Sequence, residues 1–94
     1  MTMSDELVQA RKEFAAARRE MAELRRRALA YFTMMRYARR NKASGKVTGF
    51  FSECIREVFE KRRHQRLAIA SIRRRIAQHE QVAWKHVAMT LGSR

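Results

Sequence analysis

The stretch LVQARKEFAAARREMAELRRRALAYFTMMRYA, residues 7–38, decides the fold because apolar residues recur in it at alternating intervals of three and four. With Leu7 as position a of a heptad, the a positions are Leu7, Phe14, Met21, Ala28 and Met35, and the d positions are Ala10, Ala17, Leu24, Tyr31 and Ala38. Chance alone would fill ten chosen positions in this way roughly once in two thousand trials. The pattern predicts a long helix over about 4–41 with coiled-coil character.

Charged residues flank this apolar stripe in an ordered way. The g positions begin with Glu6, Glu13 and Glu20, and the e positions begin with Arg11, Arg18 and Arg25. In a parallel two-stranded coil each g residue faces the e residue of the partner's next heptad, so every Glu would meet an Arg. This pattern predicts a homodimer, or a larger assembly, with the oligomerisation residues Leu7, Phe14, Met21 and Leu24. Four of the ten stripe residues are Ala, which makes a weak dimer seam, so packing of the stripe against a second helix of the same chain is an equal alternative.

A change in composition marks the end of the first helix. Residues 41–49, Asn-Lys-Ala-Ser-Gly-Lys-Val-Thr-Gly, are rich in turn-forming residues and predict a loop with Thr48 as the cap of the next helix. Polar residues interrupt the apolar seam that follows, so residues 50–91 predict either one helix or two helices with a break near 61–66; the interrupting residues are Arg62, Gln65, His79 and His86. A short connection makes neighbouring helices antiparallel. We therefore expect one all-α domain over 1–94, a long helical hairpin or a small helical bundle.

This hairpin would bring the most apolar parts of the two segments together. Folding near Gly45 sets residues 28–38 opposite residues 53–63. The expected core then consists of Leu29, Tyr31, Phe32, Met34, Met35, Phe50, Phe51, Cys54, Ile55, Val58 and Phe59.

Positive charge is concentrated in the middle of the chain. The net charge is +13, and residues 24–75 carry 16 Lys/Arg against three Glu. Like charges at this density repel one another, which favours an anionic partner. Arg outnumbers Lys by 17 to five, and the planar guanidinium binds phosphate through two parallel hydrogen bonds. The sequence therefore predicts nucleic-acid binding, to DNA or RNA, dominated by phosphate contacts.

The candidate nucleic-acid-binding residues are the basic clusters together with Tyr37, whose ring could stack on an unpaired base. They are Arg25, Arg26, Arg36, Tyr37, Arg39, Arg40, Lys42, Lys46, Arg62, Arg63, Arg66, Arg73, Arg74 and Arg75. Such a protein would act as an accessory or regulatory subunit of a nucleoprotein assembly. The alternative is a helical interaction module, an adaptor or inhibitor, that docks on a larger acidic protein. Binding to a membrane surface is disfavoured because Glu residues punctuate the heptads.

Several classes of function lack their characteristic residues. No nucleophile and base are suitably spaced, so we expect no catalytic residue, no small-molecule substrate and no cofactor. His79 and His86 are seven residues apart, whereas helical metal ligands lie three or four apart, so we expect no metal site. No apolar run approaches the roughly 18 residues of a membrane span, and no secretory signal is expected at the N-terminus. These features, with the single Cys54, predict a cytoplasmic protein associated with the nucleoid or with nucleoprotein.

Overall fold

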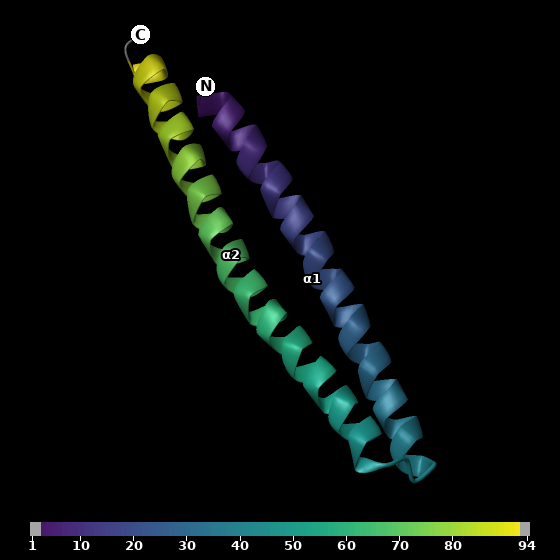
Figure 1. Ribbon diagram of the computed structural model, residues 1–94. Coiled ribbons are helices and arrows are strands. Elements are labelled where there is room, and N and C mark those ends of the chain that lie inside the picture. The colour runs from purple at the N-terminus through teal and green to yellow at the C-terminus, as the bar shows by residue number, and fades with distance from the viewer. Residues whose placement is uncertain (1–2, 93–94) are drawn as a thin grey trace. The chain divides into compact units, whose positions relative to one another are not determined.

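The computed structural model describes residues 3–92, and the side chains of residues 5–92. It is all-α: helix α1 spans Met3–Arg40 and helix α2 spans Gly45–Gly92, with no strand in the described part (Figure 1). The connection of only four residues, 41–44, reverses the direction of the chain. The predicted helical hairpin is thus confirmed.

The chain divides into two compact units, and each contains one segment of each helix. The loop unit is Arg19–Leu67, and the terminal unit is Met1–Arg18 with Ala68–Arg94. In the terminal unit Arg11 pairs with Glu80, and Glu13 pairs with Arg75. Higher numbers on α1 thus meet lower numbers on α2, so the two segments run antiparallel.

The apolar stripe of α1 forms the seam between the helices. All ten of its a and d residues are buried or half-buried, and Glu13 is the one other described side chain of α1 that is not exposed. In the loop unit Leu24, Ala28 and Val58 are 3%, 4% and 5% exposed and form one cluster. The stripe therefore packs against α2 of the same chain. A homodimer through Leu7, Phe14, Met21 and Leu24 would require α1 to leave α2.

Helix α2 is unbroken, so of the two alternatives predicted for residues 50–91 the single helix is correct and the break near residues 61–66 is not. Its own seam alternates by three and four residues and is buried or half-buried throughout: Phe51, Ile55, Val58, Arg62, Gln65, Ile69, Ile72, Ile76 and His79. Three of the four polar residues that were expected to interrupt the seam, Arg62, Gln65 and His79, occupy half-buried seam positions instead, and His86 is exposed. Lys, Arg and Gln are good helix formers, and a long Arg side chain can lay its methylene groups along an apolar surface.

The turn is tighter than predicted, because Gly45 and Gly49 belong to α2. Lys42 adopts a left-handed φ of 51°. The Ala43 N–H donates to the Ala38 carbonyl at 2.9 Å, and the Lys42 N–H donates to the Arg39 carbonyl at 3.2 Å. These two bonds form a Schellman motif, which ends α1. Thr48, the expected cap, lies inside α2, and its hydroxyl donates to the Gly45 carbonyl.

The core is smaller than predicted. The buried apolar residues are Ala10, Ala17, Leu24, Ala28, Ala38, Ile55 and Val58. Five members of the expected core are instead exposed: Leu29, Phe32, Met34, Phe50 and Phe59. In each unit a helical segment has a single neighbour, so only the stripe that faces this neighbour is covered and the flanking positions stay open to solvent.

Candidate nucleic-acid interface

The register of the two helices defines two lateral faces in each unit. With Ile55 as position a of α2, Arg11 and Glu80 are both e residues and lie 3.1 Å apart, whereas Glu13 and Arg75 are both g residues and lie 2.7 Å apart. Residues at e therefore meet across the seam on one side, and residues at g meet on the other. Position b lies beside e on the helix surface, and c lies beside g. Each unit thus has an e/b face and a g/c face.

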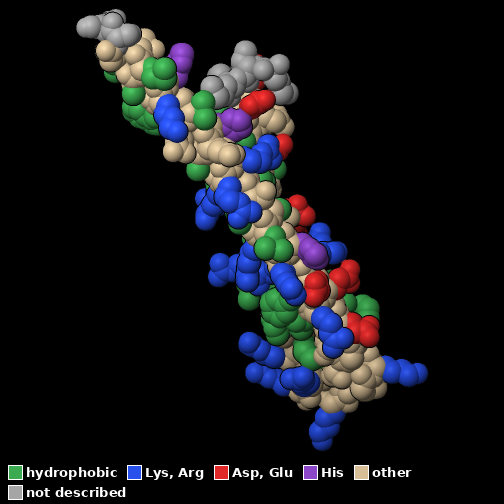
Figure 2. Space-filling model, turned by 90° about the vertical axis from the view of Figure 1, so that its left-hand side faces the viewer, with side chains coloured by type: hydrophobic (Ala, Val, Ile, Leu, Met, Phe, Trp, Pro, Cys, Tyr) green, Lys and Arg blue, Asp and Glu red, His purple; other side chains and the backbone are tan. Residues whose placement is uncertain are grey.

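The e/b face of the loop unit carries only positive charge, and we call it the arginine face. Its charged residues are all exposed: Arg25, Arg36, Arg39, Arg56, Arg63 and Arg66. The five Glu residues of this unit fall at c, f or g: Glu20, Glu23, Glu53, Glu57 and Glu60. In the lower half of Figure 2, Lys and Arg side chains surround a hydrophobic patch, and the Asp and Glu side chains in view lie toward the other edge.

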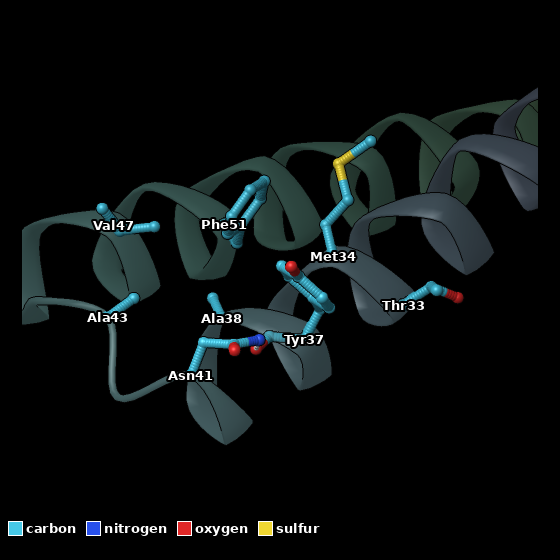
Figure 3. Close-up of a pocket in the computed structure, with 8 residues that line it drawn as sticks. All are labelled: Thr33, Met34, Tyr37, Ala38, Asn41, Ala43, Val47 and Phe51. Carbon is cyan, nitrogen blue, oxygen red and sulfur yellow. Dashed lines mark hydrogen bonds between the residues drawn. The ribbon is translucent and has the colours of Figure 1, made fainter.

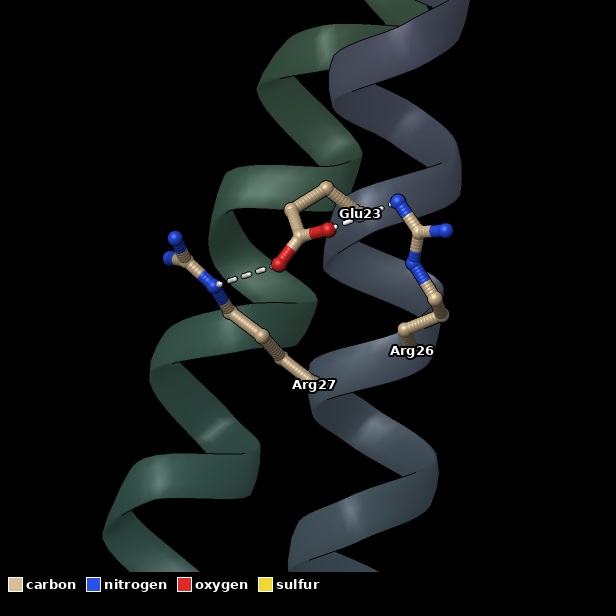
Figure 4. Close-up of polar contacts among 3 residues, drawn as sticks. All are labelled: Glu23, Arg26 and Arg27. Atoms are coloured by element: carbon tan, nitrogen blue, oxygen red, sulfur yellow. Dashed lines mark hydrogen bonds and ion pairs between the residues drawn. The ribbon is translucent and has the colours of Figure 1, made fainter.

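No arginine of the arginine face forms an ion pair within the described residues. The basic groups that do form ion pairs there lie outside this face. Glu23 binds both Arg26, at 2.7 Å, and Arg27, at 3.7 Å (Figure 4), and Lys61 binds Glu57 at 3.4 Å. Two exposed charges about 10 Å apart repel by only about 0.4 kcal/mol in water, and salt weakens this further. The free chain can therefore tolerate the arginine face, which stays available to an anion.

An aromatic pair lies in the middle of the arginine face. Phe32 and Phe59 are both e residues, and their ring centroids are 6.0 Å apart at an interplanar angle of 57°. They are 37% and 45% exposed, and the neighbouring Leu29 at position b is 58% exposed. The guanidinium carbon of Arg62 lies 5.8 Å from the centroid of the Phe59 ring. The arginine face therefore has an apolar centre and a cationic surround.

The structure brings five of the predicted site residues together on the arginine face: Arg25, Arg36, Arg39, Arg63 and Arg66. Arg56 completes this face, and it is not among the predicted residues because Glu53, Glu57 and Glu60 surround it in the sequence at a spacing typical of surface ion pairs on a helix. The signal that could have found it is the seam register of α2, which places Arg56 at position b.

The structure places the remaining predicted residues of the loop unit elsewhere. Arg26 is engaged with Glu23, and Arg62 lies in the seam. Tyr37 is at position c, on the opposite face, where it is 70% exposed. The other three are exposed but lie off the arginine face, two at f positions and one in the turn: Arg40, Lys46 and Lys42.

The Arg73–Arg75 triplet belongs to the terminal unit, and its members point in different directions. Arg73 lies over the ring of Phe14, with 5.5 Å from guanidinium carbon to ring centroid. Arg75 binds Glu13, and Arg74 is exposed at position f. Consecutive residues are about 100° apart around a helix, so a triplet does not present three charges to one ligand.

The g/c face of the loop unit has a different character, and we call it the mixed face. It exposes Met34, Tyr37, Val47 and Phe50. A pocket of about 480 Å³ opens on it next to the turn (Figure 3), lined by Thr33, Met34, Tyr37, Ala38, Asn41, Ala43, Val47 and Phe51. The charged residues of this face have both signs: Glu20, Glu23, Arg27, Glu57 and Lys61. Apolar groups with mixed charges suit a protein surface better than a polyanion.

Metal-ligating residues do not cluster in the described part of the chain. No group of three or more His, Cys, Asp and Glu side chains there could hold a metal ion. His79 lies near one carboxylate, with 3.8 Å between its Nδ1 and an oxygen of Glu6.

Neither described helix contains a stretch that is apolar enough, over a sufficient length, to cross a membrane.

No protein-family model, curated protein or solved structure matches this chain. The charge, exposure and packing of the described residues therefore provide the basis for its proposed function.

Proposed function

We propose that this protein binds nucleic acid through the arginine face of the loop unit, mainly by contacts to phosphate. The observation that supports this proposal is a row of six exposed arginines with no carboxylate among them. Arg25 and Arg39 lie fourteen residues apart on α1, which corresponds to about 21 Å along the helix. A surface of this length can contact several phosphates, and the release of their counterions would supply most of the affinity.

The mixed face supports a second part of the proposal, namely that the protein works in an assembly. Its exposed apolar residues surround a pocket, and its charges of both signs can complement those of another copy. A homodimer formed through this face would leave both arginine faces open to solvent. Such a dimer fits an accessory or regulatory subunit of a nucleoprotein complex.

A salt titration of nucleic-acid binding tests the proposal. The variant Arg36→Gln/Arg39→Gln/Arg63→Gln removes three charges from the arginine face. A control variant, Arg19→Gln/Arg27→Gln/Lys61→Gln, removes three charges from other positions of the same unit. Because the two variants have the same net charge, any difference between their affinities for nucleic acid depends on where the removed charges lay and not on the total charge.

The expected result is a steep loss of affinity with salt for the wild-type protein, measured by fluorescence anisotropy. In the arginine-face variant the slope of log K against log salt should fall in magnitude by about 2–3, since each lost phosphate contact contributes about 0.7–0.9. The control variant should keep a slope close to that of the wild type. Equal losses in both variants would contradict a localised site.

The alternative function is an adaptor or inhibitor that docks on an acidic protein. The apolar pocket of the mixed face suits docking on a protein, and the arginine face would then contact the acidic surface of that partner. If neither single-stranded nor duplex nucleic acid binds at low salt, the adaptor function would replace the first proposal.

A further inference from the structure

We infer that the nucleic acid bound by the arginine face is single-stranded, and that its bases stack on Phe32 and Phe59. This inference rests on the proposed function and extends it to the class of ligand. The feature behind it is the exposed aromatic pair at the centre of the arginine face, which phosphate binding alone leaves without a role.

The two rings are held in place by the fold. Both are e residues, so they flank the seam from opposite helices and touch at a centroid distance of 6.0 Å. The seam beneath them contains Tyr31 and Val58 of the loop-unit core. Val58 is buried and Tyr31 is half-buried, whereas 37% and 45% of the surfaces of Phe32 and Phe59 are exposed beside the seam.

The arginines lie on both sides of this aromatic pair along the helix axis. On α1, Arg25 precedes Phe32 by seven residues and Arg39 follows it by seven, about 10 Å in each direction. On α2, Arg66 follows Phe59 by seven residues, and Arg56 and Arg63 lie one turn away on either side. The result is an apolar floor with guanidinium groups at both ends.

A single strand matches this arrangement better than a duplex does. An unpaired strand can turn its bases toward an apolar floor while its phosphates reach cations at the edges, and stacking on aromatic rings is tolerant of sequence. A regular duplex keeps its bases stacked inside and presents phosphates outward, so the phenyl rings would gain nothing from it. The guanidinium carbon of Arg62 lies 5.8 Å from the centroid of the Phe59 ring. A guanidinium in this position can also interact with the π-face of a base that stacks on Phe59.

The test compares two single strands that carry similar phosphate charge but differ in their bases, and a duplex, whose bases are paired and whose phosphate charge is about twice as high at equal length. They are an oligothymidine of about 12 nucleotides, within the site sizes of single-strand-binding proteins, an abasic strand of the same length, and a duplex. Each is titrated with the wild-type protein, with Phe32→Leu/Phe59→Leu, and with the control Phe50→Leu on the mixed face. Leucine keeps an apolar side chain but removes the ring, and circular dichroism confirms that each variant remains helical.

We expect the wild-type protein to bind oligothymidine at least about tenfold more tightly than the abasic strand. The double leucine variant should lose this preference and still bind the abasic strand as well as the wild-type protein does. The Phe50→Leu variant should retain the preference. Ultraviolet cross-linking of oligothymidine to the unmodified protein gives a second measurement, with cross-links expected at Phe32 and Phe59.

Three outcomes would overturn the inference, and they also separate it from the proposed function. Equal binding of oligothymidine and the abasic strand, with the salt slope still dependent on the arginine face, would refute base stacking and leave phosphate binding intact. Tighter binding of the duplex than of either strand would do the same. Binding to anionic vesicles that depends on Phe32 and Phe59, with no binding of any oligonucleotide, would refute both.

Discussion

At the scale of single residues, Lys42 shows how the turn is made without glycine. The Schellman motif needs a left-handed residue after the helix, and this position is usually Gly. Here Lys42 takes it with a φ of 51°. The left-handed conformation costs a residue with a Cβ about 1–2 kcal/mol. The geometry of the turn therefore carries a local strain that a single substitution can remove.

Lys42→Gly should raise the free energy of unfolding by about 0.5–1 kcal/mol. The gain is less than the full strain because glycine also loses more backbone entropy on folding. Urea denaturation measures the change, and the m-value should stay constant. Lys42→Ala is the matched control, since alanine meets the same strain as lysine. If the two variants were equally stable, the turn would carry no such strain.

Arg62 is a second residue whose position in the fold is unfavourable. It occupies an a position in the seam of α2, and its Nε is buried with no hydrogen-bond partner among the described residues. A buried donor without a partner costs about 1–3 kcal/mol. Contact of the guanidinium with Phe59 offsets part of this cost.

Arg62→Met should therefore stabilise the protein by about 1–2 kcal/mol, because methionine fills the seam without burying a polar group. Thermal and urea unfolding measure the effect. The exposed neighbour gives the control: Arg63→Met should change stability by less than about 0.5 kcal/mol, but it should reduce the salt slope of nucleic-acid binding by about 0.7–0.9. A loss of stability in Arg62→Met would mean that the cation contact outweighs the cost of burial.

At the scale of the helices, the charged residues beside the seam indicate whether α1 pairs with α2 or with another copy of the chain. The heptad pattern of α1 would allow Glu13 to meet Arg18 of another copy in a parallel coil. In the structure Glu13 instead binds Arg75 of α2 at 2.7 Å. Both side chains are partly exposed, at 38% and 46%, so the pair contributes modestly to stability but reports the register of the terminal unit.

A double-mutant cycle with Glu13→Gln and Arg75→Gln should give a coupling energy of about 0.2–1 kcal/mol. High salt should reduce this coupling. The parallel cycle with Glu13→Gln and Arg18→Gln should give no coupling beyond experimental error. Coupling between Glu13 and Arg18 without coupling to Arg75 would show that α1 pairs with another copy in solution.

At the scale of the whole molecule, most large apolar side chains remain outside the core. Fourteen large hydrophobic residues of the described part are exposed, among them Tyr37 at 70% and Phe50 at 60%. Small domains often complete their core by association. On the mixed face this apolar surface is accompanied by charges of both signs, whereas on the arginine face a second copy would be repelled. We therefore expect a dimer to form through the mixed face.

Tyr37→Glu or Phe50→Glu should weaken this dimer at least about tenfold, because a carboxylate at an apolar interface must be desolvated. Sedimentation equilibrium or light scattering over a range of concentrations measures the dissociation constant. Leu67→Glu is the control, since Leu67 is 64% exposed at an f position away from both faces. A wild-type protein that stays monomeric at high concentration would contradict the dimer.

The sequence alone determined the helices, the stripe and the concentration of charge. Periodicity identified the ten seam positions of α1, because a helix that packs on another helix must present one apolar stripe. Periodicity did not identify Arg62 and Gln65 as seam residues of α2, because a long polar side chain can occupy a seam position when its methylene groups pack against the apolar surface. It also failed at the turn, where the glycines are helical and a lysine takes the left-handed position.

Only the tertiary structure decided which helix covers the stripe and which arginines stay free. The four-residue turn holds α2 beside α1, and a short loop costs little closure entropy. The resulting register pairs Arg75 with Glu13 and places Arg36, Arg39 and Arg56 on one face that has no ion pair among the described residues. Phe32 and Phe59 were expected in the core and lie on the surface, because each helical segment has a single neighbour to cover it.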